Sequence, residues 1–315
     1  MTTRLAGRSL AAWSLVTLAP LAAACSSHPA DPGPKQDQTL TQHQQAGELA
    51  YSLDRPEEAV AQYQLALAQA EARDDLTAIG NLSFNLVVAQ LRANQPAAAL
   101  ATARQTQAEL RRRGSSSFPA LDLAAATALY RTGDAGGADA AAAQLQAGSD
   151  QDMTAAASFL RGLIADDRND QPGLQAALQS LTTAVQTPAG AIIPPAQQAD
   201  RAELQARLDR RQGQFAEARA LALQAADLRR NQFDYRGLAR ALSVAADAAE
   251  KAGDPAGAAD LYLRAGRSAA AQHDPDLAKP WLARAQQLSQ DPAIRAAAQE
   301  ALDSLTQPGG AAGGS

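Results

Sequence analysis

The chain has 315 residues, enough for a sizeable core or for an elongated array of repeats, and a formal net charge of −5 at pH 7. Apolar residues make up 46% of it and aromatic residues only 4%, while β-branched residues are sparse, which favours helices packed through small side chains over sheets. The mild acidity argues against a nucleic-acid-binding protein, and a single cysteine excludes an internal disulfide and a thiolate metal site.

The first 24 residues have the composition of a secretory signal peptide. Two arginines precede an apolar run from about Leu10 to Ala24, and Pro20 interrupts that run. Its length of roughly 15 residues falls short of the about 20 that a transmembrane helix needs. We therefore predict a cleaved leader over residues 1–24.

The only cysteine of the chain, Cys25, follows this leader directly. The three alanines before it fit an ordinary small-residue cleavage site, which would leave Cys25 as a free N-terminal thiol. The stretch from Leu21 to Cys25 also resembles the lipobox of bacterial lipoproteins, with the leucine one place earlier than usual. That resemblance implies lipidation of Cys25 and stable membrane anchoring through several acyl chains. In a Gram-negative host, Ser26 after the cysteine implies the outer membrane, with the protein facing the periplasm.

Two segments of low apolar content flank the rest of the chain. Residues 25–39 are rich in Ser, Pro, Asp and Gln, and we expect a flexible tether there. The glycine-rich residues 307–315 are expected to form a disordered tail.

Six short turns interrupt the helical patterns between these segments at intervals of 36 to 44 residues. Each begins with Gly, Asn or Asp, which are the residue types that tolerate the left-handed conformation at the end of a helix. Small or aliphatic residues follow each turn at spacings that place them on one helical stripe, as Ala59, Tyr63 and Ala66 do in the first case. The turns begin at Asp54, Asn94, Gly133, Asn169, Gly213 and Gly253.

Two segments, Asn85–Asn94 and Pro56–Leu67, resemble the first and second helices of the tetratricopeptide repeat family. The resemblance extends over residues 40–272 and implies an all-α fold, a right-handed α-solenoid of about six helix–turn–helix units. Several first helices carry Ala or Val where the family has Gly, with Gly47 and Gly162 as exceptions. Residues 273–306 are predicted to form a C-terminal pair of capping helices, because an Asp–Pro step begins each of them.

Residues with catalytic or metal-binding chemistry do not form a recognisable set. The three histidines lack metal-ligand spacing, and the sequence contains no nucleophile motif and no phosphate-binding glycine loop. We therefore expect no enzymatic activity, no cofactor, no metal and no small-molecule substrate.

Several charged runs are interpreted as surface features. The acidic pairs Asp74-Asp75 and Asp166-Asp167 lie near predicted helix ends, and we expect them to be solvated. The arginine runs 111–113, 210–211 and 229–230 end predicted helices, where cations complement the helix dipole. A surface for an acidic partner is the alternative interpretation of these arginines.

The segment Gln186–Pro195 is predicted to be a helix-breaking loop within the array. Its two isoleucines, Ile192 and Ile193, are expected to pack under the next helix. A binding hook formed by the same side chains is the alternative.

The family resemblance implies that a partner binds the concave face, mainly through residues of the first helices. The matching positions are Tyr51, Phe84, Val88, Leu91, Arg92, Tyr130 and Arg131. Aromatic and arginine side chains are typical of binding hot spots, although the aromatic rings could instead pack between helices. The family's clamp for C-terminal carboxylates would require Lys and Asn where this chain has Gln44 and Glu48, with only Asn85 matching, so we predict no such clamp.

These expectations combine into a functional hypothesis. The resemblances imply a membrane-anchored lipoprotein that faces the periplasm and serves as a scaffold for an envelope protein or peptide. A regulator or activator of a cell-wall enzyme and a purely structural spacer are the alternatives.

Overall fold

The computed structural model describes residues 37–115, 118–186 and 192–305. The chain divides into two units, Met1–Asp37 and Gln38–Ser315, and everything below concerns the second. The predicted leader, the lipidation site at Cys25, most of the tether and the predicted tail lie outside the described residues.

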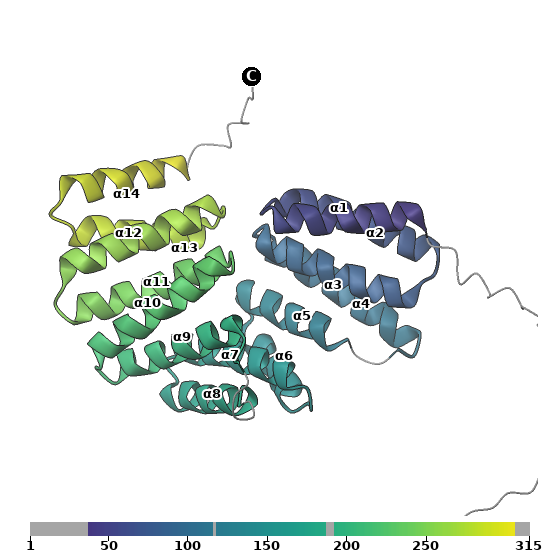
Figure 1. Ribbon diagram of the computed structural model, residues 1–315, viewed down its shortest axis with the longest axis horizontal. Coiled ribbons are helices and arrows are strands. Elements are labelled where there is room, and N and C mark those ends of the chain that lie inside the picture. Colours follow the sequence, from purple (N-terminus) through teal and green to yellow (C-terminus); the bar gives the residue numbers. More distant parts are fainter. Residues whose placement is uncertain (1–36, 116–117, 187–191, 306–315) are drawn as a thin grey trace, which may run out of the picture. The chain divides into compact units, whose positions relative to one another are not determined.

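The described residues form fourteen helices and no strand, and successive helices pack against each other as pairs in one stack (Figure 1). The predicted all-α solenoid of helix–turn–helix units is confirmed. The helices are α1 (Gln38–Ser52), α2 (Pro56–Ala72), α3 (Leu76–Arg92), α4 (Pro96–Arg112), α5 (Pro119–Arg131), α6 (Ala135–Gln146), α7 (Gln151–Asp167), α8 (Gln171–Ala184), α9 (Pro195–Arg211), α10 (Phe215–Asn231), α11 (Tyr235–Lys251), α12 (Pro255–Ala271), α13 (Pro275–Leu288) and α14 (Pro292–Ser304).

The turns within the helix pairs have the conformation that the sequence predicts. All six of the predicted turn residues have positive φ, from 55° at Asn94 to 89° at Gly133. The backbone N–H after each of them returns to the preceding helix, as from Arg55 to the Ala50 carbonyl oxygen at 2.9 Å. An aspartate cap or a proline in the first turn then begins each of the next helices except α10, so local chemistry defines both ends of most of these turns.

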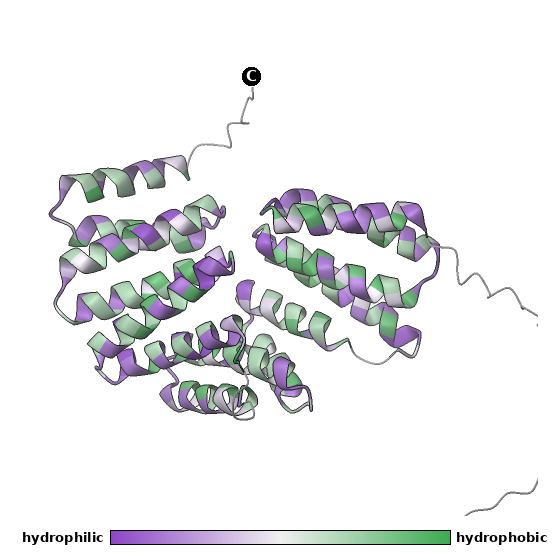
Figure 2. Ribbon diagram, in the orientation of Figure 1, coloured by the Kyte–Doolittle hydropathy of each residue, from purple (hydrophilic) through white to green (hydrophobic). Residues whose placement is uncertain are grey.

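The core consists mainly of alanine and leucine on the predicted stripes. Ala59, Tyr63 and Ala66 are all buried, and the corresponding positions of the later pairs are buried too, apart from the half-buried Leu145. Figure 2 shows hydrophobic and hydrophilic residues alternating along the helices, as one-sided burial requires. The polar Thr106 on this stripe donates a hydrogen bond to the buried Ser83 hydroxyl at 2.8 Å, so its burial is compensated.

Glycine permits one close approach that the repeat pattern indicates. A Cβ atom at Gly47 would lie 2.7 Å from Cε1 of Tyr63, so α1 and α2 could not pack as they do with a larger residue there. This is one of the positions at which the tetratricopeptide pattern has glycine.

The end of the array and the loop before α9 complete the fold. Helices α13 and α14 pair at the C-terminal end, and α14 also contacts α12. Ile193 packs against an apolar cluster from α7, α8 and the next helix, α9, in line with the prediction, but the expectation for Ile192 is wrong, because 85% of its surface is exposed. Across the described ranges, every helix is too short or too polar to cross a bilayer.

Candidate functional site

The N-terminal arm, α1–α5, meets the C-terminal arm, α9–α14, at a hollow of about 510 Å³ that we call the junction pocket. The ends of α1, α3 and α5 contribute one side of it, and the turns α10–α11 and α12–α13 contribute the other. Its lining includes Tyr51, Asp54, Val88, Leu91, Arg92, Arg131, Phe233, Tyr235, Arg236 and His273.

Five of the seven residues predicted from the sequence line this pocket: Tyr51, Val88, Leu91, Arg92 and Arg131. The pocket therefore collects side chains from three successive first helices at one place. Sequence reasoning did not identify the opposite wall, which the C-terminal arm supplies.

The other two predicted residues lie between helices, away from the pocket. Phe84 packs with Phe118 at a ring-centroid distance of 6.5 Å. The Tyr130 hydroxyl donates a hydrogen bond to Asp167 at 2.6 Å. Burial and the neighbouring Asp167 raise the pKa of Tyr130 above its usual value.

Polar contacts join the two arms at the pocket. The Arg92 guanidinium donates to the Phe233 carbonyl oxygen at 3.2 Å, and the Asn94 amide donates to the His273 carbonyl oxygen at 2.7 Å. Arg236 donates in turn to the Asn94 side-chain oxygen at 3.4 Å. These bonds connect residues 141 to 179 positions apart, so the pocket depends on the two arms staying together.

The two turns that receive these bonds have unusual residues at their left-handed positions. Phe233 and His273 have φ of 57° and 53°, whereas Gly, Asn or Asp occupies the other left-handed positions of the described chain. A bulky residue in this conformation is strained by about 1–2 kcal/mol. Phe233 is nevertheless 63% exposed, and its ring packs edge-on against Tyr235 at 6.4 Å. Backbone strain and an exposed ring thus coincide at the pocket.

Arg92 is held by its own arm. Its guanidinium lies 4.7 Å from the Tyr51 ring centroid and forms an ion pair with Asp54 at 2.8 Å. Although burial disfavours its charge, Tyr51 and Asp54 raise the pKa of Arg92 above its usual value. The cation and the ring are therefore fixed as a unit on one wall.

Arg131 is held differently. Its guanidinium donates to the Leu91 carbonyl oxygen and, at 2.5 Å, to the Asn94 side-chain oxygen. Burial lowers the pKa of Arg131 to about 10, and repulsion from Arg236 contributes. Its partners are neutral groups, which hold the cation in place without balancing its charge.

A buried charge network lies beside the pocket, and sequence reasoning missed it. Glu203 on α9 is fully buried and receives Arg207 at 3.0 Å, Arg229 at 3.4 Å and Arg240 at 2.6 Å. Although burial opposes ionisation, these three cations lower the pKa of Glu203 to about 2. The one sequence signal was the spacing of Glu203 and Arg207, four residues apart on a helix that buries this face.

The prediction that Asp166 is solvated is wrong. It is 4% exposed and receives Arg207 at 2.6 Å, Arg210 at 3.0 Å and Arg211 at 2.5 Å. Arg210 and Arg211, assigned to the helix dipole or to an acidic partner, thus pair with an acid of the chain itself. Only Asp167 of this acidic pair is exposed, as expected.

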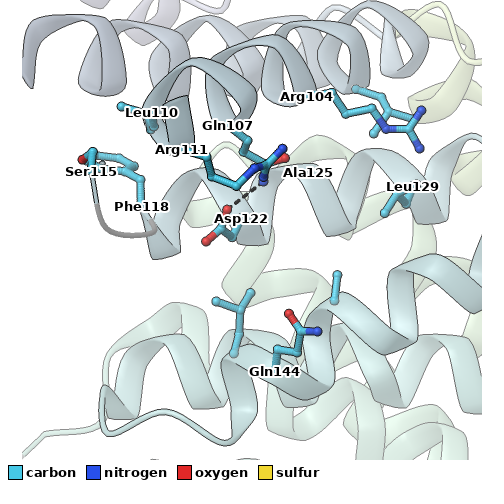
Figure 3. A pocket seen from close by; sticks show the side chains of 13 residues that line it. Arg104, Gln107, Leu110, Arg111, Ser115, Phe118, Asp122, Ala125, Leu129 and Gln144 are labelled. Atoms are coloured by element: carbon cyan, nitrogen blue, oxygen red, sulfur yellow. Dashed lines mark hydrogen bonds between the residues drawn. The ribbon is translucent and has the colours of Figure 1, made fainter. Parts of the chain in front are cut away.

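A second hollow, of about 560 Å³, lies between α4, α5 and α6 (Figure 3). Leu110, Phe118 and Leu129 line it, and Gln107 donates to Asp122 across it at 2.7 Å. Apolar side chains line it together with arginine, amide, hydroxyl and carboxylate groups. In the described part of the chain no group of three His, Cys, Asp or Glu residues could hold a metal ion.

Comparisons with known proteins add structural similarity alone. The sequence matches no known family model and no curated protein sequence. The structure is similar to a tetratricopeptide repeat protein from Parabacteroides merdae, with a TM-score of 0.48, 15% identity, and coverage of 86% of this chain and 100% of that one. It is also similar to the TPR2AB domain of yeast Sti1, solved in complex with pHSP90, with a TM-score of 0.34, 16% identity, and coverage of 80% and 98%. The fold assignment rests on the helices and turns described above.

Proposed function

We propose that this chain is an envelope scaffold that is anchored through a lipid on Cys25, faces the periplasm and holds a segment of a partner protein in the junction pocket. The observation that carries the proposal is the meeting of half-buried aromatic and arginine side chains and the exposed Phe233 ring, which come from two distant parts of the chain. Tyr51 and Arg92 come from the N-terminal arm, and Phe233 and Tyr235 come from the C-terminal arm. Aromatic and arginine side chains are the residue types enriched in binding hot spots.

The strained turns support the same proposal. Asn or Gly at position 233 would relieve the backbone, and a carbonyl oxygen for Arg92 would still be present. The phenylalanine ring adds little to the core because most of it is exposed. Contact between the Phe233 ring and a partner would explain why a strained backbone position carries this side chain.

The scaffold is proposed to act by binding alone. Both hollows are lined by apolar, arginine, amide, hydroxyl and carboxylate groups, and the sequence contains no recognisable catalytic motif. A partner enzyme in the cell wall could still be the molecule that is held, and the same experiment would identify it.

Site-specific photocrosslinking in intact membranes tests the pocket. A photoreactive amino acid replaces Phe233 in one variant and the comparably exposed Leu65 of α2 in a matched control. We expect one reproducible adduct from position 233 and none of the same mass from position 65. Identical adducts from both positions, or no adduct from position 233, would contradict the proposal and favour a structural spacer.

The anchor has its own test. Cys25→Ala removes the sulfur that would carry the lipid, and we expect the mature chain to leave the membrane fraction. Retention of Cys25→Ala in membranes at the wild-type level would show that another feature holds the protein there.

A further inference from the structure

Among the described residues, the arginines of the junction pocket and of the Glu203 network have carboxylate partners, except Arg131. Arg207, Arg229 and Arg240 share Glu203, and Arg236 pairs with Asp274 at 2.5 Å. Within residues 37–115, 118–186 and 192–305, no carboxylate forms an ion pair with Arg131. The Nε atom of Arg131 is buried without a hydrogen-bond partner as well.

Arg131 and Arg236 converge on one neutral oxygen. Both donate to the Asn94 side-chain oxygen, Arg131 from the N-terminal arm at 2.5 Å and Arg236 from the C-terminal arm at 3.4 Å. Asp274 is the single carboxylate paired with these two cations. These two guanidinium groups therefore carry one positive charge more than their ion pairs balance, while Glu57 and Asp234 also line the pocket, with Asp234 paired to Arg229.

This excess charge has a physical cost, which the lowered pKa of Arg131 registers. Burial weakens the solvation of the guanidinium, and the like charge of Arg236 adds repulsion. An anion bound beside both arginines would remove the imbalance and would form charge-assisted hydrogen bonds. A singly charged group suits the imbalance better than a dianion, because Asp54 and Asp274 would repel a second negative charge.

The other residues that line the pocket favour an apolar group next to the bound anion. Val88 and Leu91 lie on the N-terminal wall beside Tyr51, and the exposed ring of Phe233 lies on the opposite wall. We propose that the junction pocket binds one carboxylate of a peptide segment between Arg131 and Arg236, with an adjacent apolar side chain against Tyr51 and Phe233. This deepens, and rests on, the proposed function of the pocket as the site that holds a partner.

The proposed site differs from the clamp that the sequence argued against. It uses the ends of helices from two arms, and none of Gln44, Glu48 or Asn85 lines it. Because Arg131 and Arg236 belong to different arms, a carboxylate between them would also hold the arms together. We therefore expect ligand binding to stabilise the hydrogen bonds from Arg92 to Phe233 and from Asn94 to His273 against separation of the arms.

The test compares two small probes that differ in charge alone. N-acetylphenylalanine carries a carboxylate beside an apolar ring, and N-acetylphenylalanine amide carries the same ring without the charge. In the full mature chain with labelled arginine, the Nε–H signal of Arg131 is expected to shift saturably with the acid and not with the amide. Equal shifts with both probes, no shift with either, or a response to inorganic phosphate alone would overturn the proposal.

Arginine variants locate the binding. Arg131→Gln keeps a hydrogen-bond donor but removes the charge, and we expect affinity for the acid probe to fall about tenfold to a hundredfold. Arg104→Gln, at an exposed arginine of α4, is the matched control and should leave that affinity unchanged. Equal affinity in Arg131→Gln and wild type would overturn the proposal. Should Arg131→Gln fail to fold, the comparison of the acid and amide probes on the wild-type chain still tests whether the pocket binds a carboxylate.

The photocrosslink at position 233 separates this inference from the proposed function. If the partner adduct survives in Arg131→Gln at the wild-type yield, the pocket binds its partner without the carboxylate, and only the further inference fails. If the adduct is absent in wild type, the proposed function fails whatever the probes show.

Discussion

The two arms follow one repeat pattern but have different interiors. In the N-terminal arm, apolar residues such as Ile79, Leu82 and Leu86 pack around Tyr63. In the C-terminal arm, alanines line α11 on several sides, and charged side chains are buried with Glu203 at their centre. Apolar packing stabilises an interior directly, whereas a buried ion network adds little net stability but makes incorrect pairing costly. We therefore expect the network to define the register of an interior that alanine alone would define poorly.

The largest expected effect comes from breaking the network at its centre. Glu203→Gln would leave Arg207, Arg229 and Arg240 buried without the charge they share. We expect a loss of about 3–5 kcal/mol in the free energy of unfolding, measured by urea titration. The control is Asp260→Asn, in an exposed ion pair with Arg264, where the loss should stay below about 1 kcal/mol. Similar losses of unfolding free energy in the two variants would show that the buried network does not set the C-terminal arm apart.

The same network predicts a pH dependence that belongs to the C-terminal arm. Burial raises the pKa of Asp200 to about 6, despite its ion pair with Arg229 at 2.5 Å. A carboxyl group with a raised folded-state pKa binds its proton more tightly when folded, so its stabilising effect is present below about pH 4 and is lost as the pH rises to about 6. Relative to Asp200→Asn, the wild-type chain should lose about 2–3 kcal/mol of unfolding free energy across that window.

Denaturant titrations of both chains at closely spaced pH values measure this difference. A constant difference between wild type and Asp200→Asn from pH 4 to 7 would mean that Asp200 is ionised throughout. The network would then be balanced more completely than the burial of Asp200 indicates.

The difference between the arms also shows what the sequence could and could not predict. The turn at Asn94 and the stripe through Ala59 follow from local residue types, so both were predictable. The burial of Asp166 was not, because its partners Arg207 and Arg211 lie 41 and 45 residues away on another helix pair. A short-range sequence pattern predicts where a helix ends and which of its faces is buried. It does not predict which distant helices pack against that face.

The same reasoning applies to the pocket. Tyr51 and Arg92 were predictable because they occupy first-helix positions of a repeat. Phe233 was not, because its turn joins one helix pair to the next and, like the turn at His273, lacks the Gly, Asn or Asp found at the other left-handed positions of the described chain. The useful signal was this exception, a bulky residue where the neighbouring turns have a small or polar one.

Helix glycines provide a comparison of packing tightness. At Gly266 of α12, a Cβ atom would lie 2.6 Å from Leu282 Cγ and 3.2 Å from the Leu282 backbone nitrogen. At Gly47 the three nearest contacts are all with the Tyr63 ring, a side chain, whereas at Gly266 a backbone atom is among them. We expect Gly266→Ala to cost about 2 kcal/mol of unfolding free energy and Gly47→Ala about 1 kcal/mol, after the gain in helix propensity.

Urea titration of the two variants measures this order. An equal or larger loss in Gly47→Ala would show that the N-terminal arm is packed as tightly as the C-terminal arm, in spite of its larger side chains.

The smallest expected effect has the opposite sign and separates stability from binding. Phe233→Asn and His273→Asn place at the two strained turns the residue that Asn94 and Asn169 supply elsewhere. Each should gain about 1 kcal/mol of unfolding free energy, because asparagine tolerates positive φ and both carbonyl oxygens still accept their bonds from Arg92 and Asn94. Thermal unfolding measures the gain, and partner capture through a photoreactive group at position 51 should fall in Phe233→Asn. A stabilised variant that keeps its partner would mean that the exposed ring serves neither the fold nor the pocket.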